Sequence, residues 1–187
     1  MFVDETYADL SSLLTYLFCN TGLTLSYPLL INTHFLHEQG AKIAPPAAIA
    51  NLNLAQRLTL WERAFKAGYV IPALSVVTAA LLTTFALKHN QNDKTALDKR
   101  FGGDWETRKK LLLISAALTG SLMIFTAIAI LPTNNKLMAL RVAANNKQEI
   151  KVGQAEALLK KWTQLHNVRV VAAFSGFALA VYSFIAV

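Results

Sequence analysis

Three side chains toward the end of the sequence have the spacing of one helical face. Trp162, His166 and Arg169 stand at positions i, i+4 and i+7, so a helix through this segment presents all three together. An imidazole exchanges protons near neutral pH, and an arginine beside hydrocarbon is costly unless it is paired or hydrated. Together with the aromatic ring, these groups suit a flat, acidic, aromatic ligand. The alternative is that Trp162 and Arg169 anchor the helix among lipid headgroups, with His166 at the same level.

A pair of amides, Asn134 and Asn135, follows a proline in the sequence PTNN. Amide side chains both donate and accept hydrogen bonds, which suits them to hold an oxyanion or a carbonyl. A polar helix cap and turn is the alternative interpretation.

The sequence Trp61-Glu62-Arg63 adds a ring and two charges. Glu62 is a candidate counter-ion for Arg169 or for Arg63. Alternatively, it forms a solvated i, i+4 pair with Lys66.

Metal ligation is a weaker interpretation of this sequence. His34, His37 and Glu38 fall within one helical turn, but carboxylate-bridged sites draw Glu and Glu-x-x-His from several helices. The sequence contains no Glu-x-x-His and no Cys/His cluster of zinc-ligand spacing. We therefore expect no metal, and keep as an alternative a membrane metalloenzyme that uses these three side chains with His166. No glycine-rich phosphate loop or dinucleotide fingerprint supports a nucleotide or flavin cofactor.

The elements that position these residues are four stretches without charge, at 10–37, 67–87, 111–135 and 170–187. About 20 apolar residues form a helix that crosses the ~30 Å hydrocarbon core. Only helices and closed barrels pair every backbone group inside lipid, and these runs are too continuously apolar for barrel strands. A soluble four-helix bundle would keep a polar face on each helix, which residues 111–131 lack. The sequence predicts an all-α, integral membrane four-helix bundle.

We expect one domain over residues 1–187, with spans at about 10–36, 67–87, 111–131 and 168–187. Residues 47–66 predict a helical approach to the second span at the membrane interface. The sequence LPTNNK is expected to end the third span, with Pro132 kinking the helix or beginning a new one. Residues 136–169 form a long helical connection, with a continuous helix from about Gln154 through the fourth span. Asn20 and Thr24 share a face with Tyr27 that should look into the bundle.

Four spans place every polar cluster described above at the same face of the membrane. The helix count by itself therefore predicts that Trp61, the two asparagines and the His166–Arg169 pair share one polar pocket. The sequence does not determine the sidedness or the oligomeric state.

Composition agrees with a membrane protein. Of 187 residues, 54% are hydrophobic, and the net charge of +7 comes from loops beside the spans. Such flanking charges meet anionic headgroups, so the bilayer is the expected partner and nucleic acid is not. The single Cys19 cannot form an intrachain disulfide and is expected to be a buried structural thiol.

The chain resembles the anthrone oxygenase-like family of small four-span membrane proteins. The resemblance covers essentially the whole chain and rests on TGLTLSYPLLI, WERAFKAGYVIPAL, LPTNNKL and WTQLHNVR, of which the last two are the more specific. It implies an oxygenase of fungal aromatic polyketide pathways that oxidises an anthrone to an anthraquinone with O₂, without a metal or organic cofactor. An endomembrane, such as the endoplasmic reticulum or vesicles, is the expected location.

That chemistry fits six residues of this chain, and we hypothesise a role for each. His166 would be the general base, with Arg169, Asn134 and Asn135 stabilising the oxyanion, while Trp61 and Trp162 bracket the planar ring.

The rival hypothesis is a non-catalytic membrane carrier of small molecules, or a helper subunit of a biosynthetic enzyme. A helper needs a lipid-facing helix surface of small residues. The third span offers one at Ser115, Thr119, Gly120 and Ser121.

Overall fold

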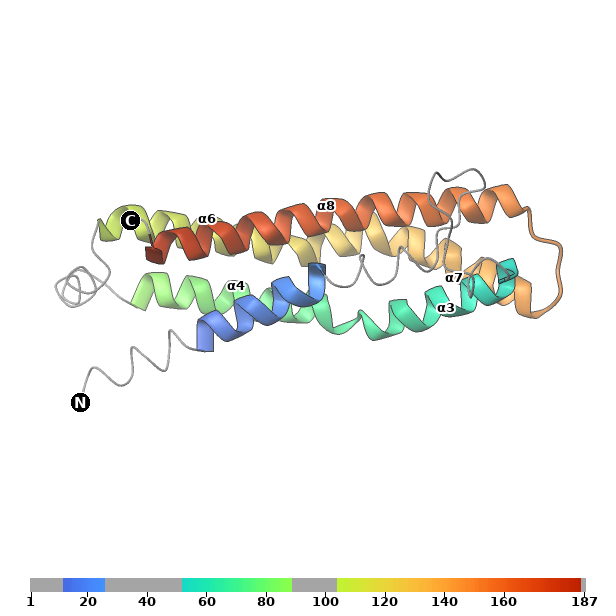
Figure 1. Ribbon diagram of the computed structural model, residues 1–187, viewed down its shortest axis with the longest axis horizontal. Helices are drawn as coiled ribbons and strands as arrows, with labels where there is room; N and C mark the ends of the chain where they lie inside the picture. The colour runs from blue at the N-terminus through green and yellow to red at the C-terminus, as the bar shows by residue number, and fades with distance from the viewer. Residues whose placement is uncertain (1–11, 26–51, 89–103, 186–187) are drawn as a thin grey trace. The chain divides into compact units, whose positions relative to one another are not determined.

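The computed structural model describes residues 12–25, 52–88 and 104–185, and these are helical with short turns (Figure 1). Residues 12–25 form the first helix. Then follow α3 (Leu54–Ala67), α4 (Val70–Lys88), α6 (Trp105–Phe125), the π-helical turn η1 (Thr126–Ile130), α7 (Leu131–Asn145) and α8 (Val152–Ile185). The described residues contain no strand, which confirms the predicted all-α class.

Three helical runs are long and apolar enough to cross a membrane: Leu54–Lys88, Trp105–Asn145 and Val152–Ile185. The chain is therefore an integral membrane protein, as its charge-free stretches predict. Of the first predicted span, residues 12–25 are helical and 26–36 lie outside the described residues, so this crossing stays a prediction. The helical approach to the second span is α3, which ends in a turn at Gly68 and Tyr69 before α4 begins.

The chain divides into two compact units. Unit 1 comprises residues 1–24, 71–124 and 170–187, and unit 2 comprises residues 25–70 and 125–169. Each of the four predicted spans contributes a helical segment to unit 1, so the predicted four-helix bundle corresponds to this unit.

Unit 1 is held by an apolar core and by hydrogen bonds between its helices. The Ser75 hydroxyl of α4 donates to Asn20 Oδ1 at 3.0 Å, which confirms that Asn20 looks into the bundle. Thr24 is also buried, whereas Tyr27 lies outside the described residues. The buried apolar residues are Leu13, Leu17, Leu82, Phe85, Ala86, Trp105, Leu112, Ala116 and Ala180.

Helices α6 and α8 approach closely in unit 1. The Ser115 hydroxyl donates to the Gly176 carbonyl at 2.6 Å, and Arg108 Nε donates to the Ser183 carbonyl at 2.7 Å. Small residues allow such close backbone packing in lipid. The second bond places a positive charge at the carbonyl end of α8, where the helix dipole favours it.

The exterior of unit 1 is apolar, as contact with lipid requires. Large exposed side chains include Phe18, Ile114, Ile124, Val171, Phe174 and Ile185. Cys19 is exposed as well, so the expectation of a buried thiol is wrong. Residue 19 stands beside the inward-facing Asn20, and adjacent helical residues point about 100° apart.

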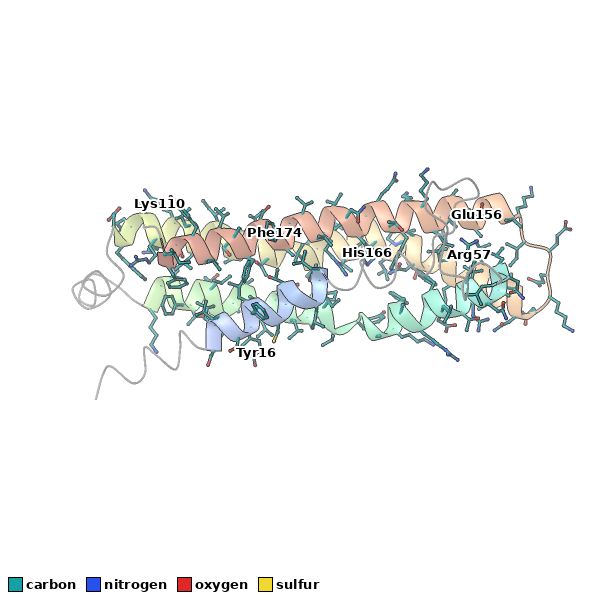
Figure 2. All side chains as sticks on the ribbon, viewed as in Figure 1. Tyr16, Arg57, Lys110, Glu156, His166 and Phe174 are labelled. Carbon is teal, nitrogen blue, oxygen red and sulfur yellow. The ribbon has the colours of Figure 1, made fainter. Side chains whose placement is uncertain are left out.

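Unit 2 contains α3, η1, α7 and residues 152–169 of α8. Its buried apolar cluster draws on all three α-helices and η1, with Leu58, Trp61, Ile130, Leu137, Leu159 and Trp162. An ion pair at 3.4 Å joins Arg57 of α3 to Glu156 of α8, both labelled in Figure 2. These contacts position the candidate site.

The helical run of the third span does not end at LPTNNK, contrary to expectation, but α7 begins there with Pro132 in its first turn, which confirms the alternative that Pro132 begins a new helix. The run stays helical from Trp105 to Asn145 and widens at η1, where the Leu131 N–H bonds to the Thr126 carbonyl five residues earlier. A proline ring clashes with the carbonyl four residues before it in an α-helix. The wider turn just before Pro132 makes room for the ring, and the helix continues.

Helix α8 is continuous from Val152 to Ile185, as predicted from about Gln154 onward. A helix of this length extends about 51 Å, well beyond the ~30 Å hydrocarbon core. One helix therefore both spans the membrane and carries part of the candidate site.

Candidate active site

All six predicted site residues lie in unit 2. They come from α3, α7 and α8 and are, in chain order, Trp61, Asn134, Asn135, Trp162, His166 and Arg169. One compact unit thus holds the groups that the sequence assigned to a common pocket.

The α8 residues share one buried face. Trp162, His166 and Arg169 are 2%, 3% and 4% exposed, while the intervening Gln164 and Val168 are exposed. The predicted i, i+4, i+7 face therefore turns into the interior of unit 2. A charged and a titratable side chain on a buried face are costly for a fold that uses them only as anchors.

The tautomer of His166 follows from its hydrogen bond. Its Nδ1 lies 3.0 Å from the Trp162 carbonyl, and a carbonyl oxygen can only accept, so Nδ1 carries the proton. The neutral imidazole then has its basic lone pair on Nε2. The ring also packs against the Trp162 indole, with centroids 3.9 Å apart, which holds the imidazole in place. Figure 2 shows His166 on α8.

Trp61 is enclosed by other aromatic side chains. Phe65 stacks parallel to its ring at a centroid distance of 5.4 Å, and the Trp162 ring meets it nearly at right angles at 6.4 Å. Trp61 is 0% exposed. The i, i+4 spacing of Trp61 and Phe65 on α3 was a visible signal for this pair.

The two asparagines of α7 have different surroundings. Asn134 is 3% exposed and lies on the same face as Ile130 and Leu137, whereas Asn135 is exposed. Adjacent helical residues point about 100° apart, so only one of the two amides faces the buried cluster.

Trp61 and Asn134 each have a buried polar atom without a hydrogen-bond partner within the part of the chain that the structure describes. These atoms are Trp61 Nε1, a donor, and Asn134 Oδ1, an acceptor. A buried group in this state costs about 1–3 kcal/mol and calls for a specific explanation.

Glu62 forms two ion pairs. Its carboxylate lies 2.7 Å from Lys66 Nζ, which confirms the i, i+4 alternative, and 3.1 Å from Arg141 Nε of α7. The sequence did not indicate Arg141, because the contact joins segments far apart in the chain. Glu62 thus ties α3 to α7 and holds the helices that carry Trp61 and Asn134.

The candidate metal ligands His34, His37 and Glu38 lie outside the described residues. Within residues 12–25, 52–88 and 104–185, no group of three His, Cys, Asp or Glu side chains could hold a metal ion.

Comparison with known proteins gives the family. The model of the anthrone oxygenase family matches residues 61–179. The chain belongs to the anthrone oxygenase family. The matched interval begins at Trp61 and includes all six candidate residues, while His34 and His37 fall before it.

Curated members of the family align with the chain at low identity. Anthrone oxygenase dmxR16 of Cryptosporiopsis sp. is 31% identical over 64% of this chain and 59% of its own length. Anthrone oxygenase AgnL2 of Paecilomyces divaricatus is 30% identical over 58% and 61%. An anthrone oxygenase of Claviceps purpurea is 26% identical over 73% and 72%. The chain spans about three fifths of the first two relatives, and no solved structure matches it.

Proposed function

We propose that this protein is a membrane-bound monooxygenase that converts an anthrone-type aromatic polyketide into the anthraquinone with O₂. The observation that carries the proposal is the buried His166, whose bond to the Trp162 carbonyl leaves the basic lone pair on Nε2. The family match and the family members named above support the substrate class. An endomembrane, such as the endoplasmic reticulum or vesicles, suits a flat, poorly soluble substrate.

The first step is removal of a proton from the central methylene of the anthrone. The resulting carbanion delocalises into an aromatic phenolate, so this C–H is acidic enough for an imidazole base. His166 Nε2 takes the proton and becomes imidazolium. Arg169 and the Asn134 amide stabilise the negative charge on the ring oxygen as it develops.

The second step uses O₂ as the oxidant. The electron-rich anion transfers an electron to O₂, and the radical pair combines to a peroxide at the former methylene carbon. Imidazolium returns its proton to the peroxide anion. The remaining C–H proton then leaves as the O–O bond breaks, and the products are one ketone and one water. The substrate supplies all the electrons, so the proposal requires neither a metal nor an organic cofactor.

The helper-subunit hypothesis loses the surface on which it depends. Ser115 and Thr119 are buried in unit 1, with Ser115 bonded to Gly176 of the same chain. Only Ser121 of that small-residue set is exposed. We therefore favour the oxygenase over a docking partner that uses this helix face.

The test is O₂ consumption by purified, detergent-solubilised protein with anthrone after metal chelation. Because anthrones oxidise slowly on their own, a protein-free sample is subtracted. We expect one O₂ per anthrone, and a loss of about 10²–10⁴-fold in His166→Ala, the usual contribution of a general base. Near-normal turnover in His166→Ala would remove the assignment of the base. Uptake abolished by chelation would favour the metalloenzyme, and no uptake above background would favour the carrier.

A further inference from the structure

The surroundings of Trp61 limit which part of its indole could meet a ligand. Phe65 covers one face of its indole at 5.4 Å, and Trp162 packs against it at 6.4 Å. With 0% of the residue exposed, the packed aromatic rings leave little of the indole for a planar ligand to stack on. The indole N–H is the remaining group of this side chain that could bind a ligand.

The indole N–H of Trp61 is a donor that cannot accept. It is buried without a hydrogen-bond partner in the described part of the chain. Because buried donors are almost always paired, this one is expected to meet an oxygen acceptor that the described residues do not provide, such as one on a bound ligand.

The complementary group lies on the neighbouring helix. Asn134 Oδ1 is a buried acceptor without a partner among the described residues. Asn134 lies one turn after Ile130 of η1 and one turn before Leu137 of α7, and both of these belong to the same buried cluster as Trp61. One donor and one acceptor therefore face the same cluster from α3 and α7.

We infer that Trp61 Nε1 and Asn134 Oδ1 form a donor–acceptor pair that binds a hydroxylated aromatic ketone. Trp61 donates to the ketone oxygen, and Asn134 accepts from a phenolic hydroxyl of the same ligand. The inference rests on the proposed function and deepens it, because the ketone oxygen is the atom that becomes negative when His166 removes the methylene proton. A donor fixed at that atom stabilises the charge as it develops.

The test compares ligands that differ by one functional group. Equilibrium dialysis in detergent measures the binding of 9,10-anthraquinone and of anthracene, which lacks the ketone, to the full chain, with protein-free micelles subtracted. Neither probe is turned over. We expect Trp61→Phe to weaken anthraquinone binding about 10-fold, the value of one buried hydrogen bond, and to leave anthracene binding unchanged. Equal loss for both ligands, or no loss, would overturn the role of the N–H.

The acceptor is tested in the same way with 1- and 2-hydroxyanthraquinone. The wild-type protein should bind one of them more tightly than anthraquinone, and Asn134→Leu should abolish that preference. Asn145→Leu is the matched control, because Asn145 is an exposed asparagine on the same helix, and it should keep the preference. A preference that survives in Asn134→Leu would overturn the assignment of the acceptor.

A measurement on the wild-type protein covers the case in which Trp61→Phe does not fold. The chain has three tryptophans, so ¹⁵N-Trp labelling gives three indole N–H signals. Anthraquinone should shift one of them downfield and anthracene should not; similar shifts with both ligands would contradict the inference. Ligand binding that depends on the ketone, without any O₂ uptake, would overturn the proposed oxygenase function but keep the donor–acceptor pair of Trp61 and Asn134. O₂ uptake that does not depend on Trp61 would overturn the donor–acceptor pair and keep the proposed oxygenase function.

Discussion

The contact between α6 and α8 at Gly176 gives the sharpest test of the packing in unit 1. A Cβ added at Gly176 would lie 2.9 Å from Thr119 Oγ1, 3.4 Å from the Ser115 carbonyl and 3.6 Å from Leu118 Cβ. The first distance is too short for a real contact, so Gly176→Ala must move the Thr119 side chain or the helices. Overpacking of this kind costs about 1–3 kcal/mol.

Most of the stability lost in Gly176→Ala should come from the clash with the Thr119 hydroxyl. Thr119→Ala removes the atom at 2.9 Å, and the contacts that remain are tight or ordinary. The double variant should therefore lose less stability than the sum of the two single variants, by about 1 kcal/mol or more, since residues in contact couple by about 0.5–3 kcal/mol.

Unfolding in mixed detergent micelles with increasing SDS, followed by circular dichroism, measures these stabilities. Gly153→Ala is the matched control on α8, because a Cβ there meets nothing within 4 Å, and it should be neutral or slightly stabilising through helix propensity. Two results would refute the reasoning: a Gly176→Ala protein as stable as Gly153→Ala, or additive losses in the double variant.

Two further predictions concern unit 2. Arg141→Met should destabilise the protein by about 1–3 kcal/mol, because its half-buried guanidinium pairs with Glu62. Lys66→Met should cost under about 1 kcal/mol, because Lys66 is exposed. Equal losses of stability for the two variants in SDS unfolding would contradict this prediction. His166→Asn keeps a donor for the Trp162 carbonyl but lacks a basic nitrogen, so it should be as inactive as His166→Ala while staying better folded. Added imidazole should restore part of the O₂ uptake in His166→Ala, and a failure of rescue together with an active His166→Asn would contradict the base assignment.

The second, third and fourth spans were predictable because a charge-free run of about 20 apolar residues indicates a helix that can cross a membrane. The continuation of the helical run through Pro132 could not be predicted, because a proline can end, kink or widen a helix. Sequence periodicity does not choose among these outcomes. The packing of the segment decides, and here it favours the π-helical turn at Thr126–Ile130.

The α8 part of the site was predictable because residues on one helix have a fixed spacing. Trp162, His166 and Arg169 share a face in any helix, and all three are buried. The difference between Asn134 and Asn135 depends on the register of α7, which the turn before it sets. The pairing of Glu62 with Arg141 depends on contact between distant segments, and one sequence carries no signal for it.

The distribution of charge supports placing an anion-forming reaction in unit 2. This unit contains 11 Lys and Arg against 4 Asp and Glu, whereas unit 1 contains 7 of each, so the whole net charge of +7 falls in unit 2. The proposed chemistry passes through a phenolate and then a peroxide, both negative. A positive environment stabilises such species more than the neutral anthrone that precedes them. Arg169 is the cation most closely tied to this effect, because it is buried three residues from His166 on the same face. A surface charge would be screened by water and ions, whereas a buried charge is screened much less, so Arg169 would act strongly on the anion that the proposed base, His166, creates.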